Sequence, residues 1–155
     1  MKSSNKRARE LKYQTFTFWI EDWIPSYSFA INHDRQRDGT YRDHVDITLL
    51  GRCLAPKKFA DRTGNLMFLG NRELMQALDE PPRNSAISMN VGVLTIRGNR
   101  TEFLGGLPRD ALWAMIPALS AGEFKVVQLR GHALHRGMAE TISIHFFREI
   151  DEEDF

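Results

Sequence analysis

Phe124-Lys-Val-Val-Gln-Leu-Arg-Gly-His-Ala-Leu-His-Arg-Gly-Met-Ala-Glu-Thr-Ile-Ser-Ile-His-Phe-Phe147 is the stretch that decides the fold class. It consists of two runs in which apolar and polar side chains alternate around a turn, and it holds three of the five histidines. Alternation with a period of two places neighbouring side chains on opposite faces of a β-strand, so the segment predicts a long β-hairpin. We expect Arg136 to lie across from Glu140 in this hairpin, and Leu134 to face Ile142.

Residues 26–32 and 44–50 alternate in the same way and predict a second hairpin. A two-residue turn at Asp38-Gly39 would set an apolar side chain against a charged one on the same face. A three-residue loop over 37–39, with Gly39 at positive φ, instead pairs Phe29 with Ile47 and Ile31 with Val45. We predict this register because a slip by one residue exposes every apolar side chain of the strand.

Four further strands and one helix follow from local patterns. Short strands are predicted at 13–20 and 65–69, and 85–97 is predicted as a strand with an apolar middle, joined by Gly98-Asn99 to the next strand so that Leu94 faces Phe103. Residues 108–119 carry an apolar stripe typical of a core-facing helix, with Gly122 as its stop. Pro117 lies inside that helix, where a missing N–H predicts a kink.

Two segments share the pattern Leu-x-Gly-x-x-Leu, at Leu49–Leu54 and Leu129–Leu134. The last Leu of each has the wrong parity for the inward face of its strand. A β-bulge at Gly51 and at Gly131 would turn both side chains inward.

Together these patterns predict a mainly β (α+β) chain. We expect an antiparallel β-sandwich or a partly open barrel of about eight strands, with one packed helix at about 108–119. Residues 1–12 are predicted to be a basic, mobile arm, residues 13–150 a single domain, and residues 151–155 an acidic tail.

Composition excludes several classes of protein. The net charge of +1 provides no general attraction to nucleic acid or to a membrane surface, and the single cysteine, Cys53, excludes an intramolecular disulfide framework. The apolar run at 16–20 is too short for a secretory signal or a transmembrane helix, so we expect a cytoplasmic protein.

Candidate ligand-binding residues are histidines and aspartates on the predicted strands. The predicted register places His33 across from Asp43, and Asn32 across from His44, which shares the outward face of its strand with Asp46. An imidazole and a carboxylate on one face can serve as an acid–base pair or as two metal ligands. His132 and His135 are three apart, which on a strand points them to opposite faces. We therefore expect no metal site and no cofactor.

Motifs for phosphate loops, dinucleotide binding, paired cysteines and nucleophile elbows are missing from the sequence. Two classes of function stay open. The first is a non-catalytic binding or assembly module that forms a homo-oligomer, which the aromatic residues Trp19, Trp23 and Phe147, lying off the main inward pattern, would suit. The second is a small enzyme or ligand carrier that uses the His and Asp side chains of the sheet.

Overall fold

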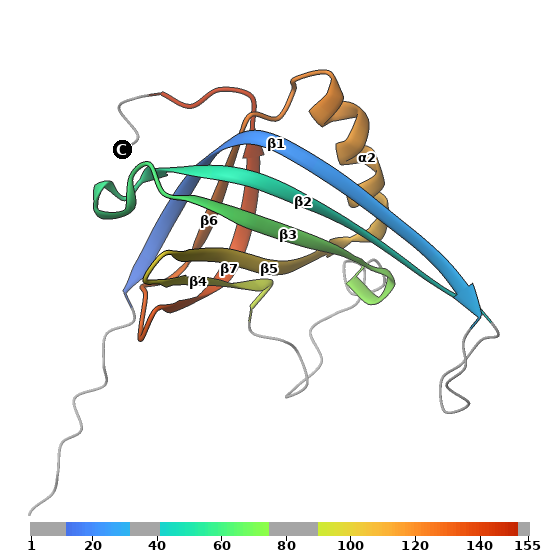
Figure 1. Cartoon of the computed structure of the whole chain (residues 1–155), viewed down its shortest axis with the longest axis horizontal. Helices are drawn as coiled ribbons and strands as arrows, with labels where there is room; N and C mark the ends of the chain where they lie inside the picture. The colour runs from blue at the N-terminus through green and yellow to red at the C-terminus, as the bar shows by residue number, and fades with distance from the viewer. Residues whose placement is uncertain (1–11, 32–40, 75–89, 152–155) are drawn as a thin grey trace, which may run out of the picture.

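A computed structural model describes residues 12–31, 41–74 and 90–151 of the chain. Seven strands form a closed barrel in the order β1-β2-β3-β5-β4-β7-β6 (Figure 1). The strands and helices, in chain order, are β1 (Tyr13–Ile31), β2 (Tyr41–Ala55), the 3-10 turn η1 (Lys57–Phe59), β3 (Thr63–Asn71), β4 (Gly92–Arg97), β5 (Arg100–Pro108), α2 (Arg109–Ser120), β6 (Val126–His132) and β7 (Met138–Phe147). The predicted mainly β chain with one packed helix is confirmed, and the described strands close on themselves rather than stacking as a sandwich.

Closure depends on β1, which is 19 residues long and has a partner on each side. Its first part, Tyr13–Trp19, pairs with β6, whereas Thr17–Ile31 pairs with β2. All neighbouring strands are antiparallel except β3 and β5, which are parallel. Because pairing with β3 begins at Asp46, the far part of the β1–β2 hairpin is a two-stranded ribbon that extends away from the barrel (Figure 1).

The barrel interior is filled by the inward side chains that the alternation predicts. Phe18, Ile47, Leu66, Phe68 and Leu94 are completely buried. Burial of such side chains is the main favourable contribution to folding, about 1.5–3 kcal/mol for each one. The predicted pairing of Leu94 with Phe103 is confirmed.

Helix α2 closes one end of the barrel. It packs against β2, β3 and β5, and Leu112, Met115 and Leu119 join the core. The helix continues through Pro117 to Ser120 and stops at Gly122, which has a φ of 70°. The N–H of Glu123 bonds to the carbonyl of Ala118 there, a Schellman ending, so the predicted stop is confirmed.

Both predicted hairpin registers are wrong. In the first hairpin Phe29 pairs with Asp43 and Ile31 with Tyr41, four positions away from the predicted partners. Each side chain keeps its predicted face, because a shift of an even number of residues does not change parity. The connection between Ile31 and Tyr41, including Gly39, lies outside the described residues.

The C-terminal hairpin closes through a two-residue turn. His135 pairs with Met138, and Arg136 and Gly137 have φ values of 52° and 77°. Two positive φ values in succession are characteristic of a type I′ turn, whose twist matches that of the flanking strands. Arg136 is therefore inside the turn rather than across from Glu140.

The β6–β7 pairing shifts beside Gly131, but the predicted bulge is on the wrong strand. Arg130 pairs with Ser143 and Gly131 with Thr141, so the extra residue is Ile142 of β7. Leu134 packs against the core as expected. Near Gly51 the pairing shifts between Ile20 and Asp22, so the extra residue lies on β1.

Candidate functional site

The end of the β1–β2 hairpin exposes a group of large apolar side chains. We call residues 27–31 and 41–45 the hairpin tip. Tyr27, Phe29, Ile31 and Tyr41 share the face that further along the hairpin lines the barrel core, yet each is 52–64% exposed. This exposure arises because the tip extends past the strands that cover the same face elsewhere.

Helix α2 contributes one more ring to this surface. Trp113 is 42% exposed, and its ring centroid lies 5.7 Å from that of Tyr27. Phe29 and Tyr41 stack with centroids 5.4 Å apart and planes inclined by 20°. We refer to Tyr27, Phe29, Ile31, Tyr41 and Trp113 as the tip cluster. Trp113 could not be recognised from the sequence, because it lies off the apolar stripe of its helix.

A polar network holds the tip against α2. The two terminal nitrogens of Arg109 donate to both oxygens of Asp43, and Arg72 lies 3.3 Å from the same carboxylate. The hydroxyl of Tyr27 also donates to Asp43, at 3.3 Å. The hydrogen bond from Arg109 is the main reason why the pKa of Asp43 falls to about 2 from its ordinary 3.8. One carboxylate and two guanidiniums leave this network with a net charge of +1.

The predicted ligand-binding residues do not come together within the part of the chain that the structure describes. Asp43 belongs to the network with Arg109, and its strand partner is Phe29 instead of His33, which lies outside the described residues. His44 pairs with Ser28 rather than Asn32 and contacts Asp46, with Nε2 and Oδ2 3.1 Å apart, on the outer face of β2.

His132 and His135 lie at the other end of the barrel. The His132 ring meets Tyr13 edge to face, with centroids 5.6 Å apart, and its Nδ1 is 3.9 Å from a Glu140 oxygen. His135 is exposed at the type I′ turn. No three His, Cys, Asp or Glu residues among those described could hold a metal ion together.

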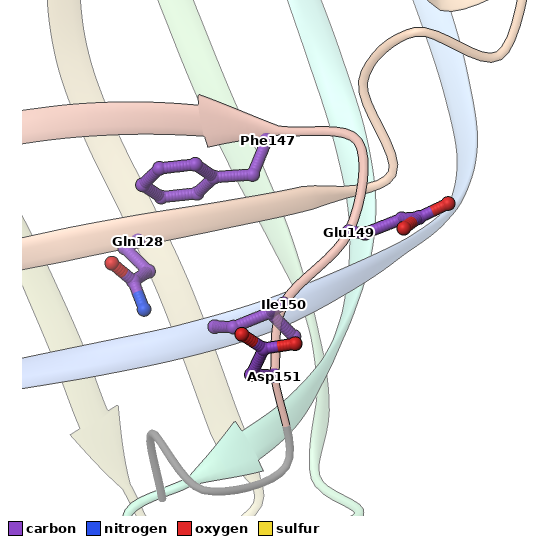
Figure 2. Close-up of a pocket in the computed structure, with 5 residues that line it drawn as sticks. All are labelled: Gln128, Phe147, Glu149, Ile150 and Asp151. Carbon is purple, nitrogen blue, oxygen red and sulfur yellow. The ribbon is translucent and has the colours of Figure 1, made fainter.

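Two hollows remain among the described residues. The first, of about 340 Å³, forms where the chain after β7 turns back across β6 and β1 (Figure 2). Ile150 and Asp151 lie beside the Gln128 amide there, Phe147 lies along the strand above, and Glu149 points away from Gln128 (Figure 2). Its open, largely polar wall offers no group with evident chemistry.

The second hollow, of about 330 Å³, is an apolar groove between α2 and β7. It is lined by Leu107, Ala111, Ala114, Met115, Ala118, Phe124, Ile144 and Phe146. Three alanines spaced along one side of the helix leave this space, because no larger side chain fills it.

Cys53 is buried in β2, and burial raises the pKa of its thiol to about 11. A thiol with such a pKa is protonated at neutral pH and is a poor nucleophile. The described residues include no helix that is both long and apolar enough to cross a membrane.

Comparisons of the whole chain with protein-family models, with curated proteins and with solved structures found no match.

Proposed function

We propose that the chain is a non-catalytic assembly module that forms a homodimer through the tip cluster. The observation that carries the proposal is the exposure of Tyr27, Phe29, Ile31, Tyr41 and Trp113 together at one place. Large contiguous apolar patches on a soluble chain mark interaction surfaces, and aromatic residues dominate the energetic centres of such interfaces.

The size of the tip cluster fits the centre of a dimer interface. Each aromatic side chain has roughly 150–250 Å² of surface, so five large side chains that are about half exposed offer on the order of 500 Å². A stable interface buries about 800 Å² per partner, of which the polar rim supplies a part. The neighbouring side chains of the hairpin tip are available for that rim.

A second copy of this chain is the partner that the charges favour. The carboxylate of Asp43 is neutralised by Arg109, and Arg72 leaves one positive charge, which is too small an excess to select a strongly acidic partner. Two-fold symmetry places the same patch on both sides of an interface, which suits a surface that is mainly apolar and carries little net charge. The reduced, buried Cys53 is compatible with the cytoplasmic address that we propose for this dimer.

A small-ligand carrier is the second candidate, and the apolar groove between α2 and β7 favours it. Its volume of about 330 Å³ lies at the lower end of the range for small-molecule sites. Enzymatic chemistry has less support, because the His44–Asp46 pair lies on a different part of the barrel from His132 and His135. We therefore rank the dimer first.

Sedimentation of two matched variants tests the proposal. Phe29→Ser removes a ring from the tip cluster, whereas Ile24→Ser removes an apolar side chain of equal exposure, 64%, from the opposite face of the same strand. We expect wild type and Ile24→Ser to sediment as dimers at tens of micromolar, and Phe29→Ser as a monomer with an unchanged circular dichroism spectrum. A monomeric wild type, or a Phe29→Ser variant that remains dimeric, would refute the proposal.

A further inference from the structure

The barrel end opposite α2 carries half of the basic residues of the described chain. β1 begins at this end, and the β2–β3 connection, the β4–β5 turn and the β6–β7 turn meet there (Figure 1). We call it the basic end. Its seven basic residues are Lys12, Lys57, Lys58, Arg62, Arg97, Arg100 and Arg136, and its three acidic residues are Asp61, Glu102 and Glu140. The resulting net charge of +4 contrasts with +1 for the whole chain.

Two of the arginines are held in place by neutral acceptors. Arg97 donates through Nε to the carbonyl of Arg136 at 2.9 Å, which uses one of its five N–H donors. Arg62 donates to the carbonyl of Gly98 and to the Thr101 hydroxyl. These bonds fix the guanidinium groups without cancelling their charge. A pre-positioned cation loses less side-chain entropy when it binds an anion.

The acidic residues of the basic end compensate only part of this charge. Arg100 pairs with Glu102 at 2.8 Å, and Asp61 lies 3.6 Å from Arg52 of β2. The exposed Lys57 and Lys58 lie on η1, in the β2–β3 connection.

Exposed rings lie among these cations. Tyr13 is 54% exposed and rests edge-on against His132, which leaves part of its own surface uncovered. Proteins bind single-stranded nucleic acid with two features. Cationic side chains line the path of the phosphate backbone, and bases stack on the faces of aromatic rings. A duplex offers no free base faces to such rings. A membrane would bind exposed aliphatic side chains, and those lie mostly elsewhere on the barrel.

We propose that the basic end binds the phosphate backbone of single-stranded nucleic acid, with a base stacked against Tyr13. This inference is independent of the proposed dimer, because it uses the opposite part of the molecule. In a dimer joined at the hairpin tips, both basic ends remain accessible, so one assembly would hold two strand-binding surfaces.

Fluorescence anisotropy with a labelled oligothymidylate of about 20 nucleotides tests the proposal on the full chain. We expect the logarithm of the affinity to fall linearly with the logarithm of the salt concentration, with a slope of about −2 to −4 for three to five phosphate contacts. A duplex of equal length should bind at least about tenfold more weakly, since it offers no unstacked bases.

The decisive variants reverse two charges in different places. Lys57→Glu/Lys58→Glu changes exposed residues of the basic end, and Lys125→Glu/Arg148→Glu changes exposed residues outside both the basic end and the hairpin tip by the same net charge. We expect the first pair to weaken binding at low salt at least about tenfold and the second pair by less than about threefold. Tyr13→Ala should weaken binding about fivefold or more, and Tyr13→Phe should retain it.

Equal effects of both charge-reversal pairs would overturn the proposal, as would wild type that does not bind the oligonucleotide at low salt. Tighter binding to vesicles of anionic phospholipid than to the oligonucleotide, lost in Lys57→Glu/Lys58→Glu, would assign the basic end to a membrane and overturn it too. Sedimentation of the same variants keeps the two proposals apart, because reversal of charge at the basic end should leave the dimer intact.

Discussion

Asp43 and Arg109 lie 66 positions apart in the sequence, yet their side chains form a bidentate ion pair between the hairpin tip and the first residue of α2. Both side chains are only 14% exposed. A paired guanidinium and carboxylate in parallel geometry is among the more directional contacts in proteins. This contact holds the tip over the helix and thereby places Tyr27 next to Trp113.

The Asp43 pair predicts a specific dependence of stability on pH. The pKa of Asp43 is about 2 in the folded chain and 3.8 ordinarily, so the folded state binds the proton less readily than the unfolded state. The stabilisation is complete above pH 4 and is lost as the pH falls towards 2. We expect the difference in melting temperature between wild type and Asp43→Asn to shrink over that interval. Exposed Glu149→Gln is the control for removal of a carboxylate, and a difference that stays constant down to pH 2 would contradict the assignment.

Cys53 should resist alkylation while the barrel is folded. Burial raises the pKa of its thiol to about 11, and only the thiolate reacts. We expect slow labelling by iodoacetamide at pH 8 in native protein and rapid labelling in denaturant, followed by mass spectrometry. Rapid labelling of the native chain would mean that β2 opens readily or that the thiol is accessible.

The stability of the turn between β6 and β7 should respond to substitutions at its two central residues. Arg136 adopts a φ of 52°, which Asn tolerates better than other non-glycine residues. Arg136→Asn should therefore raise the free energy of unfolding by a few tenths of a kcal/mol, and by no more than about 1 kcal/mol. Gly137→Ala should lower it by about 1–3 kcal/mol, because Gly137 has a φ of 77° and an added Cβ would lie 2.3 Å from Arg97 Cγ. Chemical denaturation measures both changes, and a neutral Gly137→Ala would contradict this turn geometry.

Neighbouring residues of β5 provide a test of the barrel interior. Phe103 is 2% exposed and packs against the Phe68 ring, whereas the next residue, Leu104, is 54% exposed on the outer face. Phe103→Ala should cost about 3–5 kcal/mol of unfolding free energy. Leu104→Ala should cost less than about 1 kcal/mol. Similar losses for both variants in urea denaturation would mean that the strand does not alternate between core and solvent as described.

Local patterns were sufficient where a strand or turn interacts with its neighbours in sequence. The Gly98-Asn99 turn brought Leu94 opposite Phe103 as predicted, because a tight turn fixes the register of the strands that it joins. The pairing of Ile31 with Tyr41 could not be predicted in this way. Several registers that differ by an even number of residues keep the same faces apolar, and alternation alone does not choose among them.

The functional surfaces depended on contacts that are distant in sequence. Trp113 and Arg109 join the hairpin tip only because α2 packs across β2, β3 and β5. Likewise, the basic end combines residues that are scattered along the sequence from Lys12 to Arg136. No short stretch of sequence contains them all. The overall charge of +1 conceals this separation.

The sequence by itself determined the class of the fold, the faces of its strands and the position of its helix, because alternation, apolar stripes and glycine stops act over a few residues. Only the tertiary structure decided that the barrel closes, that inward-facing Tyr27 and Phe29 are exposed, and that arginines from separate strands gather at one end. The alternation of side chains along a strand determines which face of the sheet each side chain occupies. Whether another strand covers it depends on where each partner strand begins and ends, which long-range pairing determines.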